Sequence, residues 1–143
     1  QVGMSASFKK LITKEMEDSF RVITGDENPL HKEDDFALEI SGGNFKGHAA
    51  FGMLTASFYS TVAGSVSISA LFMAGYVPGK YSLIHSFDEI SFMKPVFVGD
   101  ELTVTAEVID KDEALKMIRL KIIIKNQDNK KVSRAKMKVL VMK

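Results

Sequence analysis

The final third of the chain contains three segments in which apolar and polar residues alternate. Alternation of this kind predicts strands with one buried face. Polar residues at 110–114 and 126–130 predict hairpin turns between them, so the strands should form an antiparallel sheet with one dry face. The apolar positions are Leu102, Val104, Ala106 and Val108, then Ile118, Leu120, Ile122 and Ile124, then Ala135, Met137, Val139 and Val141.

The most apolar stretch, residues 47–77, is the element expected to cover that dry face. His48, Phe51, Leu54 and Phe58 recur there at three- and four-residue steps, which is typical of a buried helical stripe. Glycines, serines and threonines interrupt the stretch, which favours a core helix over a membrane span. A long helix on an antiparallel sheet is an α+β fold. We expect one domain over residues 4–143, and we interpret residues 1–3 as a cloning remnant.

The first forty residues predict a short strand within 5–13 and two helices. Thr13 followed by acidic residues is typical of a helix start, with the helix running to about residue 22. A second short helix follows and should end at Gly42-Gly43. The apolar residues expected to face inward from these helices are Met16, Phe20, Ile23, Phe36 and Ile40.

Charge and cysteine content exclude several classes of function. Nineteen basic and eighteen acidic residues give a net charge of +1, which gives no reason to expect nucleic acid or an anionic membrane as a partner. The absence of cysteine excludes disulfides and thiolate chemistry. His31, His48 and His85 lack a second histidine or cysteine at ligand spacing, so we expect no metal site. The chain opens without a signal peptide, and we expect a cytoplasmic protein.

The stretch ITGDENPLHKEDDFA, residues 23–37, is the candidate for chemistry. Gly25 and Pro29 stop regular structure, which predicts a fixed, irregular turn. On such a turn the carboxylate of Asp26 and the imidazole of His31 can point into one cleft. A carboxylate and an imidazole can together perform acid–base catalysis near neutral pH.

An alternative needs no function for this stretch. Asp26 and Asn28 would bond their own backbone in Asx-turns, and His31 would be a surface residue.

Three stretches resemble the MaoC-like hydratase/dehydratase family. The first resembles its signature [ST]-G-D-x-N-P-[LIV]-H, which is met by Thr24, Gly25, Asp26, Asn28, Pro29, Leu30, His31 and, further on, Ala37. GHAAFGMLTAS resembles the family's G-x-x-A-H-G-M-L, matched by Gly47, Ala50, Gly52, Met53 and Leu54. FDEISFMKPVFVGDELTV resembles a family strand and turn, matched by Ile90, Phe92, Pro95, Val96, Gly99, Asp100 and Leu102.

The resemblance implies a hot-dog fold, in which the sheet wraps a central helix, and a homodimer. It implies a lyase that interconverts trans-2-enoyl and (R)-3-hydroxyacyl thioesters of coenzyme A or acyl carrier protein, without metal or redox cofactor. Asp26 and His31 would be the catalytic pair that activates one water. The N–H of Gly52, at the start of the central helix, would receive the thioester oxygen. Asn28 would hold the turn or touch substrate, and Ser60 would face the site or simply pack.

The chain departs from the family pattern at two places. Phe51 stands where the family has a histidine, and the region 51–78 is longer than expected. We expect Phe51 and this longer region to set the acyl preference. We interpret His48 as a helix-end residue rather than a substitute for the missing histidine, and His85 as structural or surface.

Two other functions compete with the lyase. A hot-dog acyl thioesterase would usually carry an acid on the central helix, but residues 47–60 contain no Asp or Glu. A non-catalytic acyl-thioester binding module would have no need of Asp26 and His31. The lysines of the last strands predict a solvated face, or alternatively contacts with coenzyme A phosphates or an acidic carrier protein; they are Lys121, Lys125, Lys136 and Lys138.

Overall fold

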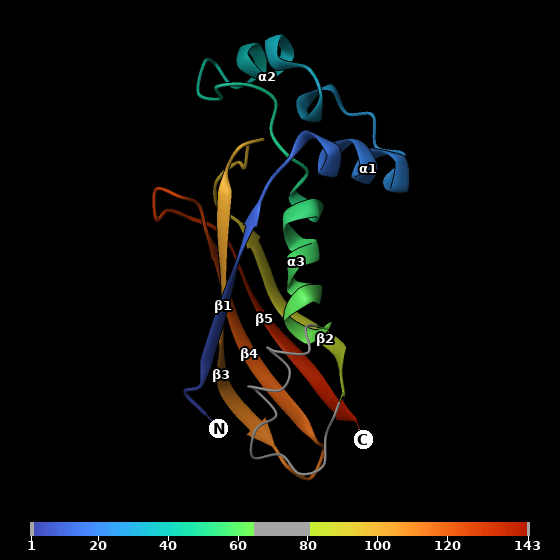
Figure 1. Cartoon of the computed structure of the whole chain (residues 1–143), viewed down its shortest axis with the longest axis vertical. Helices are drawn as coiled ribbons and strands as arrows, with labels where there is room; N and C mark the ends of the chain where they lie inside the picture. The colour runs from blue at the N-terminus through green and yellow to red at the C-terminus, as the bar shows by residue number, and fades with distance from the viewer. Residues whose placement is uncertain (1, 65–80, 143) are drawn as a thin grey trace.

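The computed structural model describes residues 2–64 and 81–142, and these form a curved antiparallel sheet packed along one helix (Figure 1). The strands are β1 (Ser5–Leu11), β2 (Tyr81–Phe92), β3 (Glu101–Asp112), β4 (Met117–Lys125) and β5 (Lys131–Met142). The helices are α1 (Lys14–Thr24), the 3₁₀ turn η1 (Pro29–His31), α2 (Asp34–Ile40) and α3 (Gly52–Gly64). The described strands are ordered β1-β3-β4-β5-β2, and each neighbouring pair is antiparallel.

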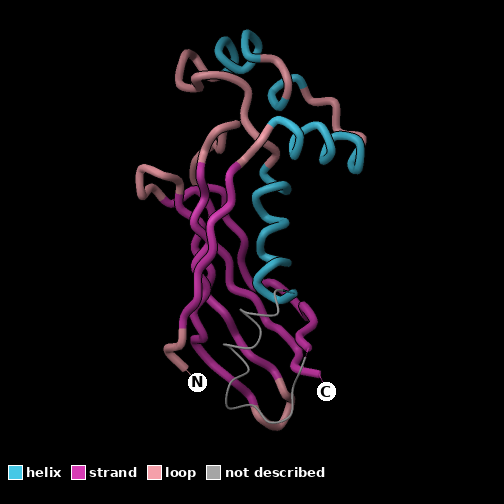
Figure 2. The backbone as a smooth tube through the Cα atoms, viewed as in Figure 1, coloured by secondary structure: helices cyan, strands magenta, loops and turns pink. Residues whose placement is uncertain are grey.

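The three alternating segments form β3, β4 and β5 as predicted. All twelve apolar positions named for them are buried, and the core that they form also includes residues of α3. The turn at 126–130 is confirmed, whereas the first turn falls at 113–116 because β3 continues to Asp112. Figure 2 shows α3 along one face of the sheet, with α1 and α2 at one end of it. This is the hot-dog arrangement that the resemblance implied.

The central helix begins at Gly52, five residues after the predicted start at Gly47. The backbone before it is already committed to other bonds: Ala49 N–H donates to Leu30 O at 3.0 Å, and Ala50 N–H donates to Val96 O at 2.6 Å. These bonds hold the segment against η1 and against the residues before β3, and the helix begins after them. The rest of the predicted helix, from residue 65, and half of the longer region, residues 65–78, lie outside the described residues.

Helix α1 starts at the predicted cap, where the Thr13 hydroxyl accepts from Met16 N–H at 3.2 Å. It ends at Gly25, whose φ of 70° lies in the left-handed region that favours glycine. Met16 and Phe20 pack against the core, but Ile23 is 79% exposed, so its predicted inward position is wrong. Helix α1 extends past α3, which leaves its last turn with little to pack on (Figure 1).

The inward face predicted for α2 is also wrong. Phe36 and Ile40 are exposed, and Ala37 is the residue that α2 buries. This short helix lies at the end of the molecule and contacts η1 rather than the sheet. The small side chain of Ala37 is enough to fill the contact between α2 and η1.

A buried hydrogen bond ties α3 to the sheet and gives a test of the packing. Ser133 Oγ donates to Ser91 O at 2.9 Å and lies 2.6 Å from the hydroxyl of Tyr59, which is therefore the donor to Ser133. Tyr59→Phe should lower the free energy of unfolding by about 1 kcal/mol, because one buried hydrogen bond is lost while the ring still packs. Urea denaturation would measure this as a lower midpoint at an unchanged slope. An unchanged midpoint would contradict the assignment.

Candidate functional site

The turn between α1 and α2 contains both Asx-turns that the alternative interpretation predicted. Asn28 N–H donates to Asp26 Oδ1 at 2.9 Å, and Leu30 N–H donates to Asn28 Oδ1 at 3.0 Å. The Asn28 side chain therefore caps η1 and holds the turn. Asp26 is exposed, and this bond uses one of its two carboxylate oxygens. The Asx-turn thus leaves the second oxygen of Asp26 for another donor.

His31 is half-buried rather than a surface residue, and its ring is fixed in orientation. Its Nδ1 lies 2.9 Å from Ala49 O. A carbonyl oxygen only accepts, so Nδ1 carries a proton, and Nε2 has the lone pair in the neutral imidazole. Arg21 Nη2 donates to the His31 carbonyl at 3.2 Å and holds the backbone as well. The ring therefore presents Nε2 as its basic atom.

Phe51 packs beside His31, with ring centroids 4.5 Å apart. Its side chain is buried, and Phe20 and the Arg21 guanidinium lie 5.2 Å and 5.8 Å from its centroid. The aromatic residue that replaces the family histidine thus forms a wall for the imidazole. Its predicted effect on acyl preference stays a prediction.

Gly52 begins α3, as the resemblance implied, and the first turn of a helix leaves N–H groups without helical partners. A hollow of about 260 Å³ lies beside it. Leu30, Ala49, Ala50, Thr55 and Phe92 are among the residues that line it. Ser60, in contrast, is exposed on α3 and does not line this hollow.

The structure therefore joins five of the predicted residues through contacts and neighbours. The turn links Asp26 and Asn28 to His31, the His31 ring contacts Phe51, and Gly52 follows Phe51 in the chain. No direct hydrogen bond links the Asp26 and His31 side chains among the described contacts.

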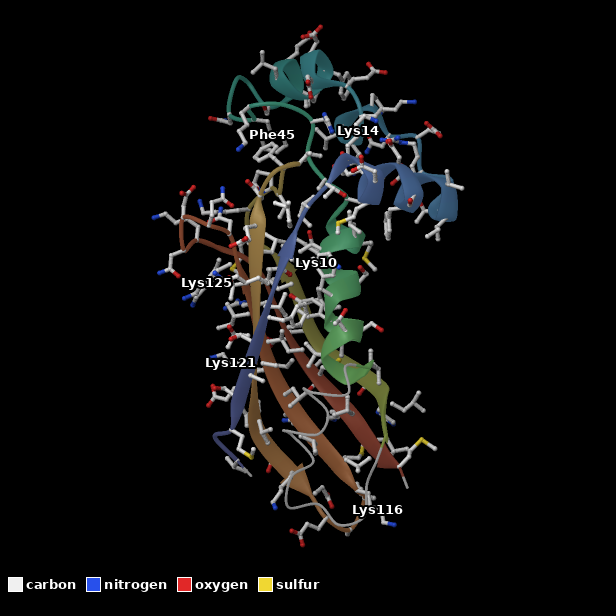
Figure 3. All side chains as sticks on the ribbon, in the orientation of Figure 1. Lys10, Lys14, Phe45, Lys116, Lys121 and Lys125 are labelled. Carbon is white, nitrogen blue, oxygen red and sulfur yellow. The ribbon has the colours of Figure 1, made fainter. Side chains whose placement is uncertain are left out.

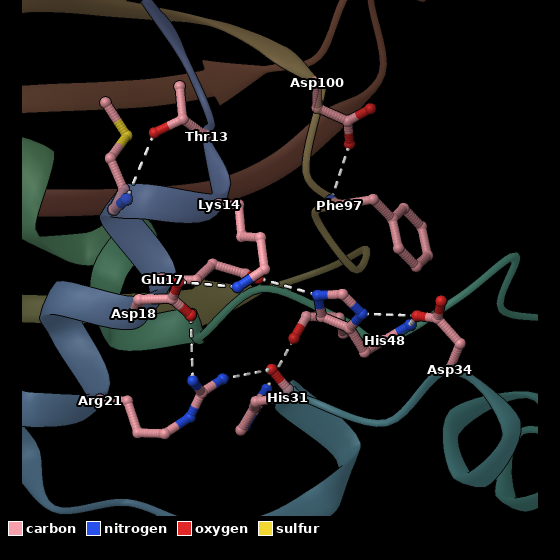
Figure 4. Close-up of polar contacts among 12 residues, drawn as sticks. Thr13, Lys14, Glu17, Asp18, Arg21, His31, Asp34, His48, Phe97 and Asp100 are labelled. Atoms are coloured by element: carbon pink, nitrogen blue, oxygen red, sulfur yellow. Dashed lines mark hydrogen bonds and ion pairs between the residues drawn. The ribbon is translucent and has the colours of Figure 1, made fainter.

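Next to this turn lies a chain of ionisable side chains that the sequence analysis missed (Figure 4). His48 Nε2 lies 2.8 Å from Glu17 Oε2, and His48 Nδ1 lies 2.5 Å from Asp34 Oδ1. His48 N–H also donates to Asp34 Oδ1 at 2.9 Å. Because α3 starts after His48, its interpretation as a helix-end residue is wrong. The one feature of the sequence that could have indicated this chain was an acidic residue, Glu17, next to the inward-facing Met16 in α1.

The environment shifts the pKa of two members of this chain. Burial alone would lower the pKa of His48, but its hydrogen bonds to Asp34 and Glu17 outweigh burial and raise it. The backbone N–H of His48, and then its ring, lower the pKa of Asp34. Both shifts favour an imidazolium beside a carboxylate.

The remaining candidates lie away from this site. His85 is exposed on β2, with Nδ1 3.0 Å from Ser86 Oγ. Figure 3 shows Lys121 and Lys125 on the side of the sheet away from α3, where a groove of about 450 Å³ is also lined by Glu101 and Glu107. Such mixed charge is typical of a solvated strand face.

Across the part of the chain that the structure describes, no three His, Cys, Asp or Glu side chains converge as metal ligands. Within residues 2–64 and 81–142, no helix combines the length and apolar character needed to cross a membrane.

Comparison with known proteins gives concordant matches. The model of the MaoC like domain matches residues 2–130. An (R)-specific enoyl-CoA hydratase of Aeromonas caviae is 34% identical over 108 residues, which is 76% of this chain and 70% of that protein. A 3-hydroxybutyryl-CoA dehydratase of Methylorubrum extorquens is 30% identical over 77% of this chain and 61% of that protein. The solved structure of the (R)-hydratase from A. caviae superposes with a TM-score of 0.81 at 29% identity, covering 99% of this chain and 97% of that one.

Thr55, on the wall of the hollow, has a buried hydroxyl without a hydrogen-bond partner among the described residues. A helical threonine commonly bonds the carbonyl four residues back, but Phe51 O already accepts from the amides of Leu54 and Thr55 at 3.1 Å and 3.2 Å. The hydroxyl is therefore a buried donor without a partner among the described residues, on a residue that lines the hollow beside Gly52.

Thr55→Val should raise the free energy of unfolding by about 1–3 kcal/mol, because it replaces an unsatisfied buried hydroxyl with a methyl group of the same shape. Thr61→Val, at an exposed position of the same helix, is the matched control and should change stability by less than about 0.5 kcal/mol. Urea denaturation of both variants measures the difference. A destabilised Thr55→Val protein would show that the hydroxyl has a partner.

Proposed function

Because the chain belongs to the MaoC-like hydratase/dehydratase family, we propose that it is an (R)-specific enoyl-CoA hydratase that interconverts trans-2-enoyl and (R)-3-hydroxyacyl thioesters. One observation carries the proposal: the bond from His31 Nδ1 to Ala49 O, which leaves Nε2 as a base on the same turn as Asp26. The Asp26 carboxylate and Nε2 are both acceptors, so one water can donate a hydrogen to each.

The reaction adds this water across the double bond. Its oxygen bonds to Cβ as the Asp26–His31 pair takes up one proton, and the electrons of the double bond move onto the thioester as an enolate. Protonation at Cα then completes the addition. Both added hydrogens and the oxygen come from water, and the reaction involves no net oxidation or reduction. The step therefore requires neither a metal nor a redox cofactor.

Gly52 provides for the negative charge that forms on the thioester oxygen. Its N–H lies in the first turn of α3, where amides lack helical partners and the helix dipole is positive. A donor placed where charge develops is worth about 2.7–4 kcal/mol in other oxyanion sites. Coenzyme A or the phosphopantetheine of a carrier protein would belong to the substrate.

Substitution of the catalytic pair tests this function. Asp26→Asn and His31→Ala should each reduce turnover of crotonyl-CoA by at least about 10²–10⁴-fold, because the first removes the negative charge that helps to take up the proton and the second removes the basic ring nitrogen. The double variant should be little worse than either single one, since the two residues act on the same water. Loss of the enoyl absorbance measures the rate.

His85→Ala, which removes an exposed imidazole on β2, is the matched control and should retain the parent rate. An Asp26→Asn protein within a few-fold of the parent would refute the assignment. Release of free thiol without hydration would support the thioesterase instead, and binding without turnover would support an acyl-thioester binding module.

We also propose that the protein is a homodimer through β2, which is an edge strand in the described sheet. Its exposed apolar side chains are Leu83, Phe87, Ile90 and Phe92. An exposed apolar edge is a template for pairing with another strand. The β2 strand of a second copy would continue the sheet.

Sedimentation at micromolar concentration should therefore give twice the chain mass of 15.8 kDa. Leu83→Lys, which places a charge on this edge, should shift the protein towards monomer, as lysine on edge strands opposes pairing. Leu115→Lys, at an exposed leucine in the turn before β4, is the control and should leave the mass unchanged. A monomeric parent would rule out the dimer.

A further inference from the structure

The chain of Glu17, His48 and Asp34 joins three elements at the end of the molecule that holds the candidate site (Figure 4). Glu17 comes from α1, Asp34 from α2, and His48 from the non-helical segment that leads into α3. Both ring nitrogens of His48 are engaged, at 2.8 Å by Glu17 and at 2.5 Å by Asp34. The two carboxylates thus hold the non-helical segment from both sides through the imidazole of His48.

Only the charged ring can satisfy both carboxylates. A neutral imidazole has one N–H and one lone pair, so it would turn a lone pair towards either Glu17 or Asp34. The imidazolium donates from both nitrogens. The two hydrogen bonds raise the pKa of His48 despite its burial, in agreement with this state.

Glu17 makes the charge on His48 especially important. Its side chain is 1% exposed, its Oε2 bonds His48, and its Oε1 has no hydrogen-bond partner among the described residues. A buried carboxylate that loses its counter-charge is strongly destabilising. On the opposite side Gly47 leaves room for Asp34, because a Cβ there would lie 3.0 Å from Asp34 Oδ1.

The clamp formed by Glu17, His48 and Asp34 acts on the backbone atom that orients His31, which is the carbonyl oxygen of Ala49. Ala49, which follows His48 directly, accepts the Nδ1–H of His31 at 2.9 Å through its carbonyl. Ala49 N–H in turn donates to Leu30 O at 3.0 Å. A shift of His48 would therefore move the acceptor that selects the Nδ1–H tautomer.

We propose that His48, held as an imidazolium between Glu17 and Asp34, is a positioning residue that keeps the Ala49 carbonyl in place and thereby keeps His31 Nε2 as the basic atom of the site. The catalytic consequence rests on the proposed hydratase function, whereas the tautomer of His31 does not. The two parts can therefore be tested separately.

Three ion pairs on the surrounding elements include no member of this chain: Lys14 with Asp18, Arg21 with Asp18, and Lys46 with Asp100. Within the chain, the pKa is raised at His48 and lowered at Asp34.

The direction of the pH dependence follows from the raised pKa of His48. A histidine whose pKa is higher in the folded protein than its ordinary value of about 6.5 stabilises the fold fully below that value. The contribution is lost as the pH rises through the folded pKa. The clamp should accordingly release His31 as the pH rises through the raised pKa of His48, and kcat should fall on the alkaline side of that pKa.

The test combines nitrogen-15 NMR of the histidines of the full chain with pH profiles of crotonyl-CoA hydration. The parent should show His31 as the Nδ1–H tautomer and an alkaline fall in kcat. His48→Gln should lower kcat at least about tenfold at neutral pH with KM little changed, abolish the alkaline fall, and mix the His31 tautomers. Glu17→Gln keeps the shape and one acceptor but removes the charge, so it should move the alkaline fall to lower pH.

Glu15→Gln on the exposed side of α1 and His85→Gln on β2 are the matched controls and should change neither the tautomer nor the pH profile. If His48→Gln does not fold, Glu17→Gln decides, because a residue that only stabilises the fold would not move the alkaline fall. Unchanged tautomer and pH profile in a folded Glu17→Gln protein would overturn the positioning role. An inactive parent would refute the hydratase proposal, and the tautomer alone would then decide the clamp.

Discussion

The non-helical segment 47–51 is the part of the backbone on which the site depends. Ala49 bonds the turn through both its N–H and its carbonyl, and Ala50 N–H donates to Val96 O. These bonds tie the chain to the turn and to the segment before β3 immediately before α3 begins. The position of Gly52, and with it the proposed donor for the thioester oxygen, follows from contacts made before the helix starts.

Ionisable groups at this end are divided between two tasks. The carboxylates of Glu17 and Asp34 face His48, where they favour a charged ring, whereas Nδ1 of His31 meets a neutral carbonyl. A carbonyl orients an imidazole without placing a negative charge beside it. The two histidines are thus suited to different work, His48 to holding the backbone as a cation and His31 to exchanging a proton at Nε2.

Features set by local pattern were predicted well from the sequence, and features set by distant contacts were not. Two-residue alternation located β3, β4 and β5 with their buried faces, and the cap at Thr13 was found because it involves neighbouring residues. Ile23, Phe36 and Ile40 were placed inward wrongly, because α1 and α2 lie at the end of the sheet where little covers them. The late start of α3 and the clamp on His48 depend on partners far away in the sequence, which no local period reveals.

Within the site, the turn contains the Asx-turns that one interpretation expected, but His31 is not the surface residue of that interpretation. Asx-turns hold Asp26 and Asn28, and the same geometry brings a half-buried His31 against Phe51. Loop-forming chemistry and acid–base chemistry are therefore compatible here, because an Asx-turn uses one oxygen of Asp26. Phe51 closes one face of the imidazole with a buried ring, where a histidine would have added a second titratable group. With packing on one side and a backbone carbonyl at Nδ1, Nε2 is the ring nitrogen of His31 left to accept a hydrogen bond, as the proposed function requires.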